Sequence, residues 1–331
     1  MIDIIIPAWN CTNTLPRTLA SIAAQTKKEK CIVTVVDDCS TEDLKPIIDN
    51  FKQYIKINYI KLSENLKYPG LVREVGLDNS IAPFVMFLDS DDILAPTAIE
   101  ILHEAMLKNP VDVIIGYFYM QDEKNNFILM KEDCTTWLHG NAYRRKFLEE
   151  NNIHFPWGYN EDGAFNTQCF MMTDKIGILE KPVMYWMHNK NSITRTEKYF
   201  SHKYADHIIT TLNFAYQNIF CYTEKNKKVL ENMGTHWTLF YKIYEELYSF
   251  FNEEYEETRV LLCDALQDFL KDLHINDFTE QEKVYFKNGF VKGLKKYYPI
   301  NRPVMITIED FLEKYNLDIS LKITDFLRGE Q

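Results

Sequence analysis

The chain has 331 residues, of which 46% are apolar and 26% charged, and its formal net charge is −11. This composition excludes a disordered chain, and the negative charge argues against a partner that is bound through nucleic-acid phosphates. No segment reaches about 18 uninterrupted apolar residues, so a membrane-spanning helix is not predicted. The seven cysteines form no C-x-x-C pair, and the start of the chain lacks a basic leader, so we expect reduced thiols and a cytoplasmic location.

The first 120 residues alternate between strand-like and helix-like segments. This alternation predicts an α/β domain with a mainly parallel sheet that is covered by helices. The predicted strands are Ile2–Pro7, Ile32–Asp37, Ile55–Leu62 and Phe84–Leu88, and the predicted helices are Thr14–Gln25, Thr41–Phe51, Gly70–Ile81 and Thr97–Lys108.

The pattern becomes mixed after residue 110 and purely helical after about residue 199. Predicted elements in the mixed part are the strands Val111–Tyr119, Phe127–Met130, Ile176–Leu179 and Pro182–His188 and the helix Ala142–Glu150. Predicted helices beyond it are Tyr204–Phe220, Trp237–Phe251, Thr258–Leu273, Glu280–Lys296 and Ile308–Tyr315. We therefore expect two domains, an α/β domain over residues 1–198 and an all-helical module over residues 199–331.

An acidic loop, Asp89-Ser90-Asp91-Asp92, follows the fourth predicted strand directly. Carboxylates at the carboxyl end of a parallel strand project into the crevice where open α/β sheets bind ligands. Mg²⁺ and Mn²⁺ prefer oxygen ligands, and Mg²⁺ is often shared between carboxylates and a substrate phosphate. The loop therefore predicts a site for a divalent cation and a diphosphate, with a helix cap near Pro96 as the alternative.

The first two predicted strands also end in polar or aromatic residues. The first strand ends in Pro7-Ala8-Trp9-Asn10, and the second ends in Asp37-Asp38-Cys39-Ser40. Trp9 can stack on a base, and Asp38 can accept an N–H from a uracil-like ring. The alternative is that Trp9 is a core residue and that Asp38 or Ser40 caps the following helix.

These segments, in order, resemble the amino-terminal signature of the family 2 glycosyltransferases with the A-type (GT-A) nucleotide-sugar fold. Two further matches are Thr18 to Thr26 and Val72-Arg73-Glu74-Val75-Gly76-Leu77. The resemblance covers roughly residues 1–195 and implies a Rossmann-like sheet with an appended helical module. The chain departs from the family where Trp9 replaces a tyrosine, Cys39 replaces a glycine, and Glu74 and Val75 follow the arginine.

The resemblance implies a UDP-sugar donor and a bound Mn²⁺ or Mg²⁺. In the family the uracil is held at the first two strand ends, which here are Pro7, Ala8, Trp9, Asn10 and Asp38. The diphosphate and the metal are held at Asp89, Ser90 and Asp91, with Asp91 as the direct metal ligand. Arg73 is implied as a phosphate or carboxylate partner because its guanidinium forms paired hydrogen bonds.

A second group of family matches supplies the remaining candidate residues. Glu161 and Asp162 resemble the family's "ED" pair, so Asp162 is expected to be the general base and Glu161 the second choice, with a helix cap as the alternative. His188 is expected to be a third metal ligand or a phosphate donor, and Ser192 and Arg195 to close over the diphosphate. Trp137 to Ala142 resembles a short family turn in which Gly140 lets the backbone approach the sugar, although a simple turn explains it equally.

The resemblance therefore predicts a metal-dependent, inverting sugar transfer from a UDP-sugar to a hydroxyl of a surface glycan, such as a teichoic or capsular polymer. Further expectations are a lipid-linked or glycan acceptor at the inner membrane face and a helical module that serves acceptor binding, oligomerisation or membrane contact. The alternatives are a non-catalytic binding or scaffold protein with the same fold and transfer to another acceptor, such as a modified DNA base. Phosphohydrolases with a D-x-D-x-T motif fit less well, because Ile93 occupies the threonine position.

Overall fold

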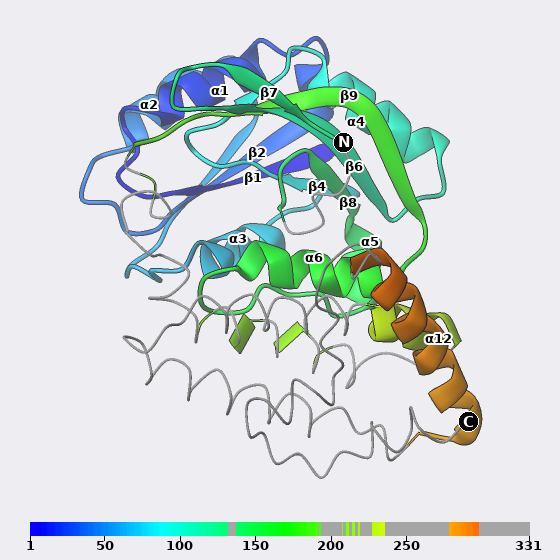
Figure 1. The fold of residues 1–331 in the computed structure, drawn as a ribbon. Coiled ribbons are helices and arrows are strands. Elements are labelled where there is room, and N and C mark those ends of the chain that lie inside the picture. The colour runs from blue at the N-terminus through cyan, green and yellow to red at the C-terminus, as the bar shows by residue number, and fades with distance from the viewer. Residues whose placement is uncertain are drawn as a thin grey trace. The chain divides into compact units, whose positions relative to one another are not determined.

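The computed structural model places a nine-stranded mixed sheet between two layers of helices (Figure 1). It describes residues 1–131, 137–190 and 192, and further along residues 207, 210, 211, 214, 215, 218, 227–235 and 278–297. The chain divides into two compact units, Met1–Glu197 and Lys198–Gln331, and the sheet lies in the first.

The sheet has a parallel half and a mixed half. Its strand order is β3-β2-β1-β4-β8-β6-β9-β5, and β7 pairs with β6 outside this path. The first four strands in this order are parallel to one another, as predicted, whereas β8 runs antiparallel to both of its neighbours. The strands span Ile2–Ala8 (β1), Cys31–Asp37 (β2), Ile57–Lys61 (β3), Phe84–Phe87 (β4), Ile93–Leu94 (β5), Val113–Gln121 (β6), Phe127–Met130 (β7), Asn141–Arg144 (β8) and Ile176–Trp186 (β9).

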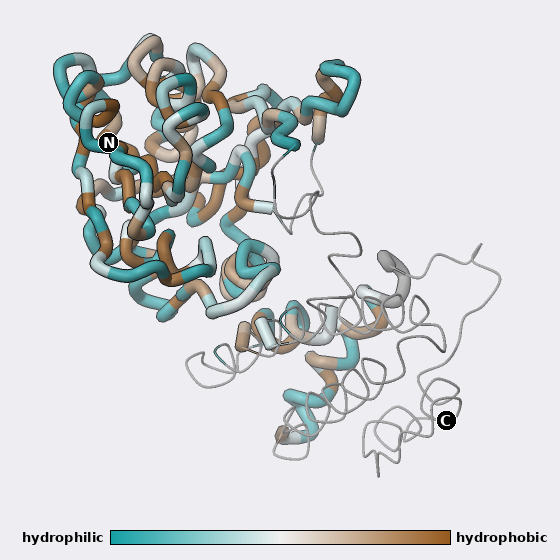
Figure 2. Tube along the Cα trace, turned by 90° about the vertical axis from the view of Figure 1, so that its left-hand side faces the viewer, coloured by the Kyte–Doolittle hydropathy of each residue, from teal (hydrophilic) through white to brown (hydrophobic). Residues whose placement is uncertain are grey.

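Helices cover both faces of the sheet, and each face has its own core (Figure 1). Strand residues alternate between these cores: Ile4 and Met86 face one, while Ile5 and Phe87 face the other. Figure 2 shows apolar residues in the interior of the first unit and hydrophilic ones on many of its outer loops. One face is covered by α1 (Leu15–Ala23), α2 (Lys45–Phe51) and α4 (Ala98–Lys108), the other by α3 (Pro69–Asp78), α5 (Arg145–Glu150) and α6 (Glu161–Met172), and a short 3₁₀ turn, η1, spans Lys28–Lys30.

The mixed half of the sheet differs from the sequence prediction in three places. The start of the predicted helix Ala142–Glu150 is strand β8, and only Arg145–Glu150 is helical. β8 is buried between β4 and β6, so strand pairing there outweighs the local helical pattern. The two short strands predicted over residues 176–188 are one strand, β9, and the two-residue strand β5, which pairs with β9, was not predicted.

Within the second unit, the described residues other than Phe278 and Thr279 are helical. The helix α12 (Glu280–Tyr297) confirms the predicted helix Glu280–Lys296, and residues 227–235 form a helix that was not predicted. These two helices approach closely, because a side chain on Gly289 would collide with the carbonyl of Glu231. The predicted helices Trp237–Phe251, Thr258–Leu273 and Ile308–Tyr315 lie outside the described residues, as does most of Tyr204–Phe220. Among the residues that are described, no helix combines the length and apolar character that a membrane crossing requires.

Candidate functional site

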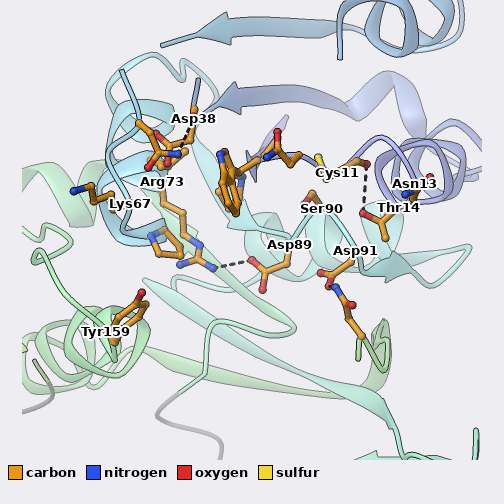
Figure 3. A pocket seen from close by; sticks show the side chains of 18 residues that line it. Cys11, Asn13, Thr14, Asp38, Lys67, Arg73, Asp89, Ser90, Asp91 and Tyr159 are labelled. Carbon is orange, nitrogen blue, oxygen red and sulfur yellow. Dashed lines mark hydrogen bonds and ion pairs between the residues drawn. The ribbon is translucent and has the colours of Figure 1, made fainter. Parts of the chain in front are cut away.

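A cavity of about 790 Å³ opens at the carboxyl ends of β1, β2 and β4 (Figure 3). It lies where open α/β sheets bind their ligands. Nine of the predicted site residues line it: Pro7, Ala8, Trp9, Asn10, Asp38, Arg73, Asp89, Ser90 and Asp91. The structure therefore brings the strand ends, the arginine of α3 and the acidic loop into one space.

Trp9 is a surface residue of this cavity. Its residue surface is 58% exposed, and it follows directly after β1. An apolar ring that is this exposed at the wall of a cavity is placed to contact a ligand. The alternative in which Trp9 is a core residue is wrong.

Asn10 holds the first two strand ends together. Its side-chain oxygen accepts hydrogen bonds from the backbone N–H of Thr41 at 2.9 Å and of Glu42 at 3.3 Å. Its own N–H donates to the hydroxyl of Ser40 at 3.0 Å. Asn10 thus lines the cavity, but its side-chain oxygen fixes the loop after β2.

The two adjacent aspartates after β2 differ in their contacts. Asp37 is fully buried and accepts hydrogen bonds from the backbone of Ser40 at 2.8 Å and from the hydroxyl of Tyr59 at 2.6 Å. Asp38 lines the cavity, and one of its oxygens accepts the N–H of Leu66 at 2.7 Å. Burial raises the pKa of Asp38 despite these backbone hydrogen bonds. Asp37 therefore supports the turn, and Asp38 faces the cavity.

The backbone explains why the resembling family has a glycine at position 39. Cys39 has a φ of 55°, which lies in the left-handed region that glycine adopts without strain. The helix after this turn, α2, begins only at Lys45, and the N-cap residue Leu44 makes no side-chain cap. Asp38 is thus not a helix cap.

The three carboxylates of the acidic loop have different surroundings, and none of them caps α4, which begins at Ala98 after the N-cap residue Thr97. Asp92 is fully buried and accepts the backbone N–H of Met187 at 2.8 Å, whereas Asp91 accepts the side-chain amide of Asn189 at 2.7 Å. These contacts tie the loop to the residues after β9. The helix-cap alternative for the loop is wrong.

Arg73 joins the acidic loop to the amino end of α6. Its guanidinium donates from Nη2 to Asp89 and from Nη1 to Glu161, each at 2.7 Å (Figure 3 shows the bond to Asp89). Burial alone would lower the pKa of Arg73, but the charges of Asp89 and Glu161 raise it. Burial alone would raise the pKa of Asp89. The charge of Arg73, followed by that of His139, outweighs burial and holds the pKa of Asp89 below its ordinary value. The three groups form an ion-pair network in which Arg73 and Glu161 are buried and Asp89 is partly exposed.

Asp162 follows Glu161 in the first turn of α6. Burial, followed by the charge of Glu161, raises the pKa of Asp162 to about 7. Its Oδ1 accepts the N–H of Gly163 at 2.8 Å, which is a contact within the helix start. A carboxylate with a pKa near neutrality is suited to accept a proton during catalysis.

Glu74, which departs from the family pattern, connects α3 to the segment before α6. Its carboxylate pairs with His154 Nδ1 at 2.5 Å and accepts the N–H of Phe155 at 2.9 Å. The hydrogen bond that the ring of His154 donates to Glu74 raises the pKa of His154 and outweighs burial, which lowers it. Glu74 thus ties α3 to the segment before α6, which carries the cavity residue Tyr159.

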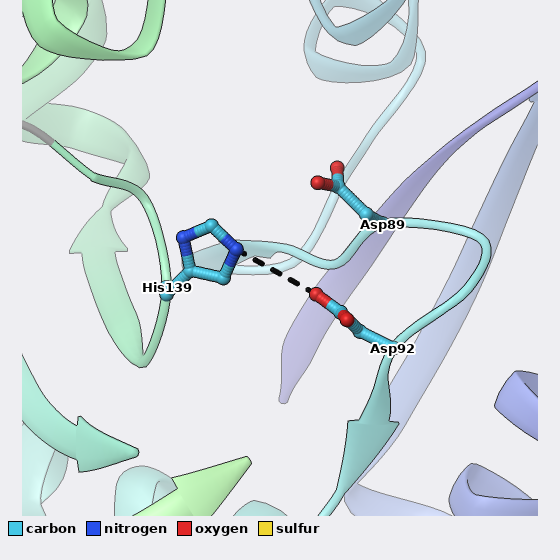
Figure 4. A group of neighbouring side chains, drawn as sticks. All are labelled: Asp89, Asp92 and His139. Carbon is cyan, nitrogen blue, oxygen red and sulfur yellow. Dashed lines mark ion pairs between the residues drawn. The ribbon is translucent and has the colours of Figure 1, made fainter. Parts of the chain in front are cut away.

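A cluster of possible cation ligands lies behind the acidic loop (Figure 4). Within the described part of the chain, Asp89, Asp92 and His139 bring one ligand atom each to within 4.8 Å of one another. Burial, followed by the charges of Asp89 and Asp91, raises the pKa of Asp92 well above its ordinary value. Burial also lowers the pKa of His139 to about 4, so its imidazole is neutral at neutral pH. A neutral imidazole and two carboxylates are a donor set that fits a divalent cation.

The predicted residues after β9 are placed in part. The backbone N–H of His188 donates to Gln121 at 3.1 Å, and the N–H of Ser192 donates to the carbonyl of Asn189 at 3.1 Å. The Nδ1 of His188 is buried and has no hydrogen-bond partner among the described residues. Neither His188 nor Asp91 belongs to the cluster of ligand atoms. Arg195 lies outside the described residues.

Several residues of the site were not predicted. His139 precedes Gly140, whose φ of 76° and contact with the backbone of Gly116 fit a turn against β6. Only this neighbouring turn could have drawn attention to His139, because nothing in its own spacing marks a ligand. Other cavity residues that were not predicted are Cys11, Asn13, Thr14, Asn65, Lys67, Pro69, Val72, Tyr159 and Asn189.

Comparisons with known proteins agree with this geometry. The family described as "Glycosyl transferase family 2" matches residues 3–161. Over 214 residues the chain is 25% identical to the poly(ribitol-phosphate) beta-N-acetylglucosaminyltransferase TarS of Staphylococcus aureus. This match covers 60% of this chain and 37% of TarS. It is 27% identical to the glycosyltransferase GlyA of Streptococcus pneumoniae, over 60% of this chain and 32% of GlyA. The chain thus spans about a third of the length of these relatives.

A solved structure shows the same fold. The crystal structure of residues 1–349 of S. aureus TarS in complex with UDP-GlcNAc superimposes with a TM-score of 0.70 at 19% identity, over 89% of each chain. The predicted A-type fold is thereby confirmed. Residues 3–161 are thus similar to glycosyl transferase family 2, and the fold is that of TarS.

Proposed function

We propose that the protein is a metal-dependent, inverting glycosyltransferase that moves a sugar from a UDP-sugar to a hydroxyl of a cell-surface glycan. The observation that carries this proposal is the ion-pair network of Asp89, Arg73 and Glu161. Asp89 and Arg73 line the cavity, and the network joins them to the "ED" pair, which lies outside the cavity lining. The names of TarS and GlyA support a glycosyl transfer, and the UDP-GlcNAc complex of TarS supports a UDP-sugar.

The donor's base is proposed to lie against Trp9 and Asp38. The exposed ring of Trp9 offers a stacking surface, and the carboxylate of Asp38 can accept the N–H of a uracil. The cavity of about 790 Å³ lies within the range of about 300–1,000 Å³ that is usual for sites of small ligands and cofactors. Pro7, Ala8 and Asn10 shape the wall on which the base rests.

The leaving diphosphate is proposed to lie between Arg73 and the acidic loop. Arg73 carries a permanent charge and is already oriented by two carboxylates, so little reorganisation is needed when negative charge develops on the diphosphate. A divalent cation held by Asp89 and its neighbours would neutralise the remaining charge of the leaving group. Ser90, Ser192 and Arg195 are proposed to complete the phosphate contacts.

Asp162 is proposed to be the general base. In an inverting transfer, a carboxylate takes the proton of the acceptor hydroxyl while its oxygen attacks the anomeric carbon opposite the leaving diphosphate. The raised pKa of Asp162 makes it a better proton acceptor than an ordinary carboxylate, and Glu161 is engaged by Arg73. Glu161 is therefore proposed to position Arg73.

The acceptor is proposed to be a hydroxyl of a teichoic, capsular or related surface polymer at the inner face of the membrane. TarS carries poly(ribitol-phosphate) in its name, and a relative from Bacillus spizizenii is a poly(ribitol-phosphate) beta-glucosyltransferase that is 25% identical over 54% of this chain. The second unit is proposed to bind the acceptor, a further copy of the chain or the membrane surface.

A donor screen tests the proposal. The full chain is incubated with Mn²⁺, poly(ribitol phosphate) and one UDP-sugar at a time, and released UDP and polymer-linked sugar are both measured. We expect one donor to be consumed and Asp162→Asn to lose most of this activity, since removing a general base typically costs about 10²–10⁴-fold in rate. Full activity of Asp162→Asn would exclude Asp162 as the base, and no turnover with any donor and acceptor would favour a binding protein.

A further inference from the structure

We propose that Glu74 and His154 are positioning residues of the reaction, which as an ion pair hold the loop before α6 against α3 and so keep the start of α6 in place beside Arg73. This inference rests on the proposed function, because it names residues that support that function's general base. Glu74 is one of the positions at which the chain departs from the family that it resembles, so the pair is a feature of this chain.

Adjacent residues of α3 contact two different parts of the chain around α6. The two helices lie side by side on one face of the sheet (Figure 1). Arg73 reaches Glu161 in the first turn of α6. Glu74 reaches His154 and Phe155 in the loop that precedes this turn. Since successive helix residues point about 100° apart around the helix axis, the two contacts lie on different sides of α3 and together resist its rotation relative to α6.

The loop before α6 needs an anchor of this kind. Residues 151–160 contain no helix or strand, and Asn152, Gly158 and Asn160 have positive φ values of 50°, 109° and 69°. Asn160 is the N-cap residue of α6, but it makes no side-chain cap hydrogen bond. Such a segment lacks the regular backbone hydrogen bonds that fix a helix or a strand, so its position depends on contacts with neighbouring elements.

Glu74 supplies these contacts with both of its carboxylate oxygens. Oε1 lies 2.5 Å from Nδ1 of His154, and Oε2 accepts the backbone N–H of Phe155 at 2.9 Å. Phe155 is buried and stacks on Phe165 of α6 with the ring centroids 4.1 Å apart. The carbonyl of His154 accepts the side-chain amide of Gln168, also on α6, at 2.8 Å. Glu74 is thus joined to the two loop residues that pack against α6.

The surroundings of His154 favour a charged ring. Its Nδ1 faces Glu74 and its Nε2 faces the side-chain oxygen of Asn152 at 3.0 Å, and only the imidazolium can donate from both nitrogens. Asp78, also on α3, is the other titratable group among the described residues that acts on this charge. The hydrogen bond to Glu74 raises the pKa of His154 and outweighs burial, so the pair stays charged to a higher pH than a free histidine would.

Asp162 is the site residue that depends most on this pair. It lies in the first turn of α6, and burial is the main cause that raises its pKa to about 7. If the loop moves away from α3, water reaches the start of α6 and this burial decreases. Arg73 keeps its contact with Asp89, so the cationic partner of the diphosphate stays in place. Loss of the pair should therefore impair proton transfer more than donor binding.

Steady-state kinetics of the full chain measure this difference. We expect Glu74→Ala and His154→Ala to lower kcat at least tenfold, while the KM for the UDP-sugar changes less than threefold. Glu74→Gln keeps an oxygen that can accept the N–H of Phe155 and should recover part of the loss. The double variant should lose no more than the more impaired single variant, because both substitutions remove the same contact. Glu104→Gln, which alters an exposed helical pair with Lys108, is the matched control and should keep wild-type kinetics.

A titration of the carboxyl signals by nuclear magnetic resonance gives a second readout that needs no donor. The signal of Asp162 is assigned by its absence in Asp162→Asn. We expect the pKa of Asp162 to fall by about one pH unit or more in Glu74→Ala and His154→Ala and to stay unchanged in Glu104→Gln. Circular dichroism checks that each variant is folded. His154→Ala serves if Glu74→Ala is not folded, because the side chain of His154 is 44% exposed.

The outcomes separate this inference from the proposed function. An unchanged pKa of Asp162 in the folded variants would overturn the positioning role even where the wild type turns over a UDP-sugar normally. An unchanged kcat, or a loss confined to KM, would overturn it as well. A lowered pKa of Asp162 in both variants, together with no turnover of any UDP-sugar by the wild type, would uphold the positioning of Asp162 and reject the function.

Discussion

Gly70 lies against Glu161 with no room for a side chain between them. A Cβ atom on Gly70 would be 2.7 Å from Cγ and 2.8 Å from Cβ of Glu161. Gly70 is in the first turn of α3, on the same helix as Arg73, so this close approach sets the distance at which Arg73 reaches Glu161. The contact couples backbone packing to the charged network of the site.

Gly70→Ala is expected to lower activity more than stability. Alanine ordinarily favours a helix over glycine by up to about 1 kcal/mol, but overpacking typically costs about 1–3 kcal/mol, so we expect a small net destabilisation. Displacement of Glu161 should misdirect Arg73 and reduce kcat at least tenfold. Urea unfolding and initial rates measure the two effects. The exposed Asp78→Ala on the same helix is the control, and wild-type kcat in Gly70→Ala would contradict the coupling.

Arg73→Ala is expected to be strongly destabilising. It leaves the buried Glu161 and the partly exposed Asp89 without their shared cation. Removing one partner from a buried ion pair, such as that of Arg73 with Glu161, typically costs about 3–5 kcal/mol. Arg73→Lys should recover only part of this loss, because one ammonium group cannot reproduce the two-armed contact.

Equilibrium unfolding in urea measures this series. The control is Lys108→Ala, which removes an exposed pair with Glu104 and should cost less than about 1 kcal/mol. Equal losses for Arg73→Ala and Lys108→Ala would show that the network is not a buried, stabilising unit.

The parts of the site that the sequence predicts are those that sit next to their strands in the chain. Trp9 and Asp38 follow β1 and β2 directly, and Asp89 lies two residues after the end of β4, so the hydrophobic strand pattern places them at one edge of the sheet. The burial of Asp92, in the same acidic loop, could not be predicted in this way. Asp92 is buried because it receives the backbone N–H of Met187, 95 residues away, and local spacing carries no information about such a contact.

The same limitation explains the missed strand β8. Asn141 and Tyr143 are fully buried, and the Tyr143 hydroxyl donates to Asn166, 23 residues away in the chain, at 2.6 Å. The sequence Asn-Ala-Tyr-Arg has no strong strand propensity, so its conformation is decided by the strands on either side. His139 was missed for the same reason, because its position in the site depends on where β8 begins.

The activity is expected to rise with pH through about 7. The pKa of Asp162 is raised to about 7, and a general base acts only in its ionised form. The pH dependence of kcat/KM should therefore have a limb near 7 on its acidic side and level off about one pH unit above it. A limb near pH 4 would contradict the assignment of Asp162 as the base.

The same shift makes Asp162 a source of instability at neutral pH. Because its folded-state pKa lies above the ordinary value of 3.8, the folded state binds the proton more tightly, and stability falls as pH rises from about 4 to about 7. Asp162→Asn lacks this loss. Its stability relative to the wild type should grow between pH 4 and pH 8, by an amount on the order of 1–3 kcal/mol. Thermal unfolding across this range measures the trend, and a difference that does not vary with pH would contradict it.

Trp9→Ala is expected to weaken UDP binding while leaving the fold intact. The side chain is exposed, so its removal should change stability by less than about 0.5 kcal/mol. Stacking of a base on an aromatic ring contributes about 1–3 kcal/mol, so the Kd for UDP should rise by about 5–150-fold. Trp9→Tyr keeps an aromatic face and should remain within about fivefold of the wild type. Calorimetric titration of UDP in the presence of Mn²⁺ gives these values.

Tyr54→Ala is the matched control for Trp9→Ala. Tyr54 is 54% exposed, close to the exposure of Trp9, but it does not line the cavity. Its removal should leave the Kd for UDP unchanged, because a general loss of surface aromatic area has no effect on a site that it does not contact. If both alanine variants weakened UDP binding equally, or if Trp9→Ala bound UDP as the wild type does, the base would lie elsewhere in the cavity and the strand-end assignment of the donor would be wrong.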